Sequence, residues 1–218
     1  MAVKIIPSIL TDDPRELERM VRLAETFTDY VQIDIADGDF VPSHSIICED
    51  LVEVAPRIAW EAHLMVDYPE EYLADFQKAG AKKVIFHYEA APSPNRVINK
   101  ALELGIKVGL AANPETPAAS LFPFLDDIDG VLLLTVNPGF YGSRFILAIL
   151  AHINILKAKN PDIKVSIDGG IKEENIAQVV HSGADAVCIG SGIFWSSDPA
   201  ASFRRFNALA SEALLGTT

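Results

Sequence analysis

Two carboxylates and one imidazole stand at the ends of short apolar segments that are far apart in the sequence. Asp34 and His63 each end such a segment, and Asp168 directly follows a third. Carboxylates can remove and return a proton beside a carbonyl group, and carboxylates with an imidazole can also bind a divalent metal. Either chemistry requires the three side chains to meet, so the elements that carry them must bring them together.

Short runs rich in Val, Ile and Leu alternate with longer amphipathic segments along the whole chain, a pattern typical of buried parallel strands separated by helices. The predicted strands are Lys4–Ile6, Tyr30–Asp34, Ile58–His63, Lys83–His87, Lys107–Leu110, Gly130–Leu134, Lys164–Ile167 and Ala186–Ile189. The predicted helices are Pro14–Thr26, Ile47–Ala55, Pro69–Ala79, Pro94–Leu104, Pro117–Leu121, Phe145–Lys159, Glu173–Ser182 and Pro199–Leu215.

Several predicted helices begin with a proline preceded by a capping Asp or Ser, as at Asp13, Ser93 and Asp198. Eight strand–helix units in 218 residues predict one (β/α)8 TIM barrel spanning residues 1–218. An open doubly wound sheet is the alternative architecture. The first predicted strand is not followed by Gly-x-Gly-x-x-Gly, which argues against a dinucleotide-binding version of that sheet.

Active sites of such barrels lie at the carboxyl ends of the strands. Side chains alternate along a strand, so one set should point into the barrel mouth. A single Asp at such a position is as readily a turn cap as a catalytic residue, and a single His is more often a hydrogen-bonded core residue than a metal ligand. The prediction of a site therefore depends on Asp34, His63 and Asp168 converging. The predicted inward set is Gln32, Asp34, Ala36, Glu61, His63, Met65, Ser166 and Asp168.

Glycines follow the last two predicted strands. Gly169 and Gly170 come after Asp168, and Gly190 precedes Ser191. Small residues at this place let backbone N–H groups approach an anion, so the sequence predicts a phosphate site. The segment Gly139–Gly142 reads either as a loop that closes over a substrate or as an ordinary connection.

The formal net charge of −12 argues against nucleic-acid and anionic-membrane partners. Cys48 and Cys188 are expected to be reduced thiols of a cytoplasmic protein. We find neither a signal peptide nor an apolar run long enough to span a bilayer.

An ordered set of motifs resembles the ribulose-phosphate 3-epimerase family from one end of the chain nearly to the other. The motifs are Pro7-Ser-Ile-Leu10, Ile33-Asp-Ile-Ala-Asp-Gly-Asp-Phe-Val-Pro42, Glu61-Ala-His-Leu-Met65, Asn113-Pro-Glu-Thr-Pro117, Val136-Asn-Pro-Gly-Phe140, Asp168-Gly-Gly170 and Gly190-Ser191.

The resemblance implies an isomerase that inverts the carbon beside the ketone of a pentulose phosphate, with D-ribulose 5-phosphate as the default substrate. By this likeness Asp34 and Asp168 are the two acid/base residues and, with His63, metal ligands for Zn, Mn, Fe or Co. A homo-oligomer is also implied. The residues that would contact substrate are Ser8, His63, Met65, Gly139, Phe140, Tyr141, Gly142, Gly169, Gly170, Gly190 and Ser191.

The chain departs from the family at several positions on the active-site side. Gln32 stands where the family has a His that completes the metal site. An amide oxygen is a poorer ligand than imidazole for zinc or iron, so we expect weaker metal binding, a harder ion such as manganese or magnesium, or no metal. The other departures are Ala36 and Leu134 in place of methionines, Asp39 in place of a His and Tyr141 in place of a Gly.

Three alternatives remain open. The substrate can be a six-carbon ketose phosphate such as allulose 6-phosphate, because Ala36 leaves room that Tyr141 would reduce. A lyase or decarboxylase would carry Asp-x-Lys-x-x-Asp, but Ala36 stands where that Lys would be. A phosphosugar-binding protein without activity is the non-enzyme alternative.

Overall fold

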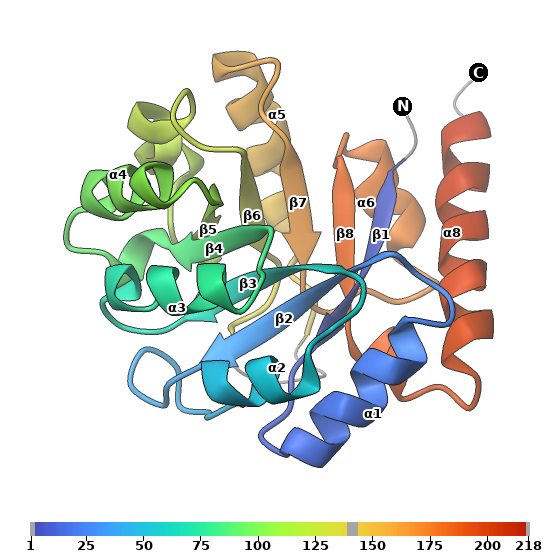
Figure 1. The fold of residues 1–218 in the computed structure, drawn as a ribbon. Coiled ribbons are helices and arrows are strands. Elements are labelled where there is room, and N and C mark those ends of the chain that lie inside the picture. The colour runs from blue at the N-terminus through green and yellow to red at the C-terminus, as the bar shows by residue number, and fades with distance from the viewer. Residues whose placement is uncertain (1–2, 139–143, 217–218) are drawn as a thin grey trace.

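The structure is a computed structural model that describes residues 3–138 and 144–216. Eight parallel strands form a closed barrel in which each strand pairs with its neighbours in sequence and β1 pairs with β8, as Figure 1 shows. The predicted (β/α)8 barrel is therefore confirmed. The strands are β1 (Lys4–Ile9), β2 (Tyr30–Ala36), β3 (Ala59–Met65), β4 (Lys83–His87), β5 (Lys107–Ala112), β6 (Gly130–Leu134), β7 (Val165–Asp168) and β8 (Ala186–Ile189).

Helices cover the outside of the barrel (Figure 1). The α-helices are α1 (Pro14–Ala24), α2 (Cys48–Val54), α3 (Leu73–Lys78), α4 (Pro94–Leu104), α5 (Ala151–Lys159), α6 (Ile176–His181), α7 (Ser191–Phe194) and α8 (Pro199–Leu215). The 3₁₀ turns are η1 (Pro69–Glu71), η2 (Tyr88–Ala90), η3 (Ala118–Phe124) and η4 (Leu147–Leu150).

Some predicted helices were wrong in type or extent. The segment predicted as one helix over 69–79 divides at Tyr72 into η1 and α3. The segment after Pro117 is the 3₁₀ turn η3, because Pro123 lies within it and cannot donate the backbone hydrogen bond of an α-helix. The short helix α7 was not predicted at all, since four residues carry too little periodicity to be recognised.

The predicted caps divide in the same way. The side chain of Asp13 accepts a hydrogen bond from Arg15 N, and that of Asp198 accepts one from Ala201 N, both at 2.9 Å. Ser93 is the N-cap residue of α4, as predicted, but its side chain makes no capping hydrogen bond.

Most of the buried apolar side chains belong to two clusters. The larger apolar cluster lies between the strands and the surrounding helices and includes Ile33, Leu64 and Ile167. A smaller apolar cluster includes Ile85 and Leu132. The residues on either side of these two along their strands belong to the larger cluster, so side chains alternate between the two clusters. Both sets are consistent with the predicted alternation of inward and outward side chains. The inside of the barrel also holds polar residues, and these form the site.

Candidate active site

A pocket opens at the carboxyl ends of the strands, and most of the predicted site residues line it. Strands β1, β2, β3, β7 and the segment after β8 all contribute to its wall. The lining residues predicted from sequence are Ser8, Asp34, His63, Met65, Asp168, Gly169, Gly170, Gly190 and Ser191. The structure therefore brings together the described part of the predicted substrate-binding set.

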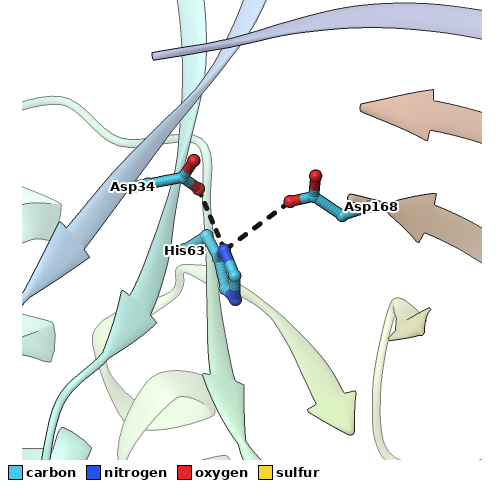
Figure 2. A group of neighbouring side chains, drawn as sticks. All are labelled: Asp34, His63 and Asp168. Carbon is cyan, nitrogen blue, oxygen red and sulfur yellow. Dashed lines mark hydrogen bonds and ion pairs between the residues drawn. The ribbon is translucent and has the colours of Figure 1, made fainter. Parts of the chain in front are cut away.

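The two carboxylates and the imidazole meet at the centre of this pocket. Asp34 and His63 are register partners on β2 and β3, and His63 Nδ1 lies 2.9 Å from Asp34 Oδ1. Asp168 ends β7 and places Oδ2 3.9 Å from the same nitrogen. Figure 2 shows both carboxylates directed at one edge of the imidazole ring. Chain segments distant in sequence thus supply three potential ligands to one point.

Gln32 lies inside the barrel below the two carboxylates, as the strand alternation predicted. Its amide Nε2 donates hydrogen bonds to Asp34 Oδ1 at 2.8 Å and to Asp168 Oδ2 at 2.7 Å. Its Oε1 accepts a hydrogen bond from Cys188 Sγ at 3.1 Å. Gln32 is fully buried, so these contacts fix the amide with its donor group between the carboxylates.

Asp168 is held firmly at the end of its strand. Its backbone oxygen accepts hydrogen bonds from Thr135 N at 2.8 Å and from Thr135 Oγ1 at 2.9 Å. Burial, followed by the negative charge of Asp34, raises the pKa of the Asp168 carboxyl, although His63 and the hydrogen bond from Gln32 act against the rise. The carboxyl is therefore able to hold a proton more readily than an exposed Asp.

The opposite edge of the His63 ring contacts a second histidine. His63 Nε2 lies 2.9 Å from His87 Nε2, and His87 Nδ1 lies 3.3 Å from Glu89 Oε2. Burial lowers the pKa of His87 to about 4. For His63, burial is the largest influence and lowers the pKa, but the hydrogen bond and charge of Asp34 outweigh it and the pKa is raised.

The donor atoms of the central group fit a divalent cation. One ligand atom each from Asp34, His63 and Asp168 lies within 4.8 Å of the others, and the three side chains are at most 13% exposed. Ligands at about 2.0–2.2 Å from an ion such as zinc are themselves roughly 3–4 Å apart, and His63 Nδ1 lies 2.9 Å from Asp34 Oδ1 and 3.9 Å from Asp168 Oδ2. Gln32 presents Nε2 to this place, and only a half-turn of its amide would offer Oε1 as a further ligand.

Glycine is required in the turn after β7. Gly169 has a φ of +107°, and a Cβ at this position would lie 2.4 Å from the side chain of Val136. Gly170 has a φ of +66°, and its Cβ would lie 3.1 Å from the backbone of Phe145. Left-handed backbone and close packing both exclude larger residues here. The turn therefore leaves its backbone open to the pocket.

Four residues of the site were not predicted to act there. His87 ends β4 and Glu89 lies in η2, and Thr135 and Cys188 lie in apolar runs that read as core. The His-x-Glu spacing was a usable signal, because it places both polar side chains at the carboxyl end of a predicted strand, where the sites of such barrels lie. The predicted residues Gly139, Phe140, Tyr141 and Gly142 lie outside the described residues.

Within residues 3–138 and 144–216, none of the helices is both long enough and apolar enough to cross a lipid bilayer.

Comparison with known proteins identifies relatives along nearly the whole chain. Residues 4–194 match the ribulose-phosphate 3 epimerase family. A ribulose-phosphate 3-epimerase of Aquifex aeolicus is 37% identical over 215 residues, covering 94% of this chain and 96% of the relative. A ribulose-phosphate 3-epimerase of Bacillus subtilis is 35% identical over 204 residues, covering 90% of this chain and 94% of the relative.

Solved structures share the fold at lower identity. The 3-hexulose-6-phosphate synthase from Salmonella typhimurium superposes with a TM-score of 0.74 at 16% identity, covering 97% of this chain and all of that one. This similarity shows the barrel architecture alone. The sequence relatives, in contrast, cover both the barrel and the motifs that carry Asp34, His63 and Asp168. The chain therefore belongs to the ribulose-phosphate 3-epimerase family.

Proposed function

We propose that this protein interconverts D-ribulose 5-phosphate and D-xylulose 5-phosphate, with Asp34 and Asp168 as the two acid/base residues. The observation that carries the proposal is the meeting of these carboxylates from β2 and β7 in one pocket, linked by the amide of Gln32. Inversion of a carbon requires a proton to leave one face and return to the other. Two carboxylates on different walls of a pocket meet this requirement.

The reaction begins when one carboxylate removes the hydrogen on C3 of the bound sugar. The electron pair of the broken C3–H bond moves toward the C2 carbonyl and gives an enediolate. The second residue, which is a protonated carboxylic acid at the start, then donates its proton to the opposite face of C3, and the carbonyl forms again. Each turnover leaves the two residues with exchanged protonation states, so the reverse reaction starts from the other carboxylate.

A divalent metal is implied by the family, and Asp34, His63 and Asp168 would hold it. When bound, the metal supplies positive charge that stabilises negative charge on the substrate oxygens. Zn, Mn, Fe and Co are the candidate ions. A Gln32 amide turned to offer Oε1 would favour a harder ion among them, whereas its Nε2, which faces the carboxylates, cannot bind metal.

The rest of the pocket would bind and orient the sugar phosphate. The turns at Gly169–Gly170 and Gly190–Ser191 line the pocket, and small residues there let backbone N–H groups approach an anion, which supports a phosphate site. Ser8 and Met65 line the same pocket and would contact the sugar. We assign Gly139–Gly142 to the same task on family likeness alone.

Deuterium incorporation at C3 tests the proposed reaction. Metal-stripped protein is incubated with D-ribulose 5-phosphate in deuterated water, with and without manganese, zinc or iron(II), and followed by NMR. Exchange with formation of D-xylulose 5-phosphate supports the epimerase. Exchange with allulose 6-phosphate instead would identify a six-carbon substrate. Calorimetric binding of sugar phosphate without any exchange would identify a binding protein.

We also propose that the protein acts in the cytoplasm as a homo-oligomer, on the same family likeness. Light scattering coupled to size-exclusion chromatography measures the oligomeric state.

A further inference from the structure

A chain of hydrogen-bonded side chains, His63, His87 and Glu89, leads away from the pocket through the end of β4. It passes from His63 to His87 through the 2.9 Å Nε2–Nε2 contact, and from His87 to Glu89 through the 3.3 Å contact between Nδ1 and Oε2. His63 and His87 are 1% and 0% exposed. Buried polar groups must find partners, so each ring nitrogen in this hydrogen-bonded chain has a defined role as donor or acceptor.

The outer end of the hydrogen-bonded chain is anchored on the β5 side. Glu89 Oε1 accepts a hydrogen bond from the backbone N–H of Asn113 at 2.9 Å, and it also accepts one from Thr116 Oγ1. These bonds occupy one carboxylate oxygen and leave Oε2 directed at His87. The position of Glu89 is therefore set by the backbone and not by the histidines.

The chemistry of the anchor determines where the hydrogens lie. An ionised carboxylate can only accept, so the hydrogen of His87 is on Nδ1. Burial disfavours a second hydrogen on His87, because that would charge the ring. His87 Nε2 is then an acceptor, and the short contact to His63 Nε2 requires the hydrogen to be on His63.

We propose that Glu89 and His87 are positioning residues that keep a hydrogen on His63 Nε2, and so present His63 Nδ1 to a divalent metal between Asp34 and Asp168. The inference rests on the metal role given to His63 in the proposed function. A metal-binding histidine usually donates its other ring N–H to a carboxylate or carbonyl, which fixes the ring and its tautomer. Here a second histidine transmits that effect from the carboxylate.

Glu89→Gln is the sharpest variant, because the side chain keeps its size but has one oxygen. The backbone N–H of Asn113 and the hydroxyl of Thr116 both need that oxygen, so the amide NH₂ turns toward His87 Nδ1. His87 then carries its hydrogen on Nε2 and donates it to His63 Nε2. His63 can then keep a hydrogen only on Nδ1, the atom that lies 2.9 Å from Asp34 Oδ1 and would bind metal.

Two measurements follow this change. Long-range ¹H–¹⁵N NMR of metal-free protein reports which nitrogens of His63 carry hydrogen. Titration with Mn²⁺, followed by electron paramagnetic resonance, reports affinity. We expect Glu89→Gln to remove the hydrogen from His63 Nε2 and to weaken Mn²⁺ binding by about 10- to 100-fold. Thr116→Val is the matched control: it removes one bond to Glu89 but leaves the carboxylate, so both readouts should stay close to those of the unmodified protein.

The outcomes separate this inference from the proposed reaction. An unmodified protein without a hydrogen on His63 Nε2 would overturn it, even if Glu89→Gln does not fold. A folded Glu89→Gln protein with unchanged His63 signals and unchanged Mn²⁺ affinity would overturn it too. Absence of C3 exchange in the unmodified protein would count against the epimerase assignment alone, because neither the NMR of His63 nor the Mn²⁺ titration uses a substrate.

Discussion

The thiol of Cys188 donates a hydrogen bond to Oε1 of Gln32 at 3.1 Å inside the barrel. This bond holds the amide so that its NH₂ group is directed at the two carboxylates of the pocket. Burial and the surrounding carboxylates raise the pKa of Cys188, which keeps the thiol protonated and able to donate. A donor group thus stands between the two carboxylates, where a histidine would instead offer a ring nitrogen.

Replacement of Gln32 by histidine should raise the metal content of the protein and its rate of epimerisation. An imidazole nitrogen would add a ligand to Asp34, His63 and Asp168, whereas the amide nitrogen cannot bind metal. Metal content is measured by mass spectrometry of the purified protein and the rate by C3 exchange.

Gln32→Leu is the control for that variant, because it removes the amide without adding a ligand. Its metal content should stay below that of Gln32→His. Unchanged metal content and rate in Gln32→His would mean that metal does not bind at Asp34, His63 and Asp168, because residue 32 contacts both carboxylates.

Asp34→Asn and Asp168→Asn should each abolish C3 exchange and leave the fold intact. Asparagine has nearly the same shape but cannot take or return the proton, and loss of general acid–base catalysis alone costs about 10²- to 10⁴-fold in rate. Deuterium incorporation measures the loss, and circular dichroism checks the fold. If both variants kept their activity, the assignment of two carboxylate bases would be wrong.

Gly169→Ala should destabilise the protein. Its φ of +107° is unfavourable for alanine, and the new Cβ would lie 2.4 Å from Val136. Strained backbone alone costs on the order of 1–3 kcal/mol.

Gly183→Ala separates the two causes. Gly183 also has a positive φ, of +88°, but its nearest neighbour would be 4.0 Å from the added Cβ. The loss of unfolding free energy in urea should therefore be smaller for Gly183→Ala. Equal losses would show that the contact with Val136 is accommodated without cost.

Stability should fall in acid partly through Asp185. Burial, the largest influence, raises its pKa, but the hydrogen bonds from Lys157, Val165 and Lys164 outweigh it, so the folded-state pKa lies below the usual 3.8. A lowered pKa stabilises the fold above the unfolded-state value, and the contribution is lost as the pH falls through the folded-state value. Asp185→Asn should therefore lower the urea midpoint at pH 7 more than at pH 3. An equal decrease of the urea midpoint at pH 7 and at pH 3 would contradict the stabilising role of the Asp185 carboxylate.

Sequence reasoning located the centre of the site because strand alternation is a local property. The spacing of Gln32, Asp34 and His63 along two strands was enough to predict that they face inward, and the barrel then placed Asp168 beside them. The contact between His63 and His87 was beyond such reasoning, because it depends on the stagger between β3 and β4. The orientation of the Gln32 amide likewise depends on Cys188, which is 156 positions away.

Errors in the fold have a related cause. Several strands were predicted too short at their carboxyl ends, as in β1, which continues to Ile9, and β3, which continues to Met65. Apolar runs end where the pocket begins, but backbone pairing continues, as the register of Ala36 with Met65 shows. Hydropathy thus underestimates strands at the very positions that line a site.

The closed barrel also decides how the protein can be handled. Strand β1 starts at Lys4 and helix α8 ends at Leu215, and both described ends lie on the side where the strands begin, opposite the pocket (Figure 1). An affinity tag, a fusion partner or a sensor surface attached at either end therefore leaves the mouth of the barrel facing the solution. Immobilised protein can then be exposed to sugar phosphates and metal ions in turn without the support blocking their entry.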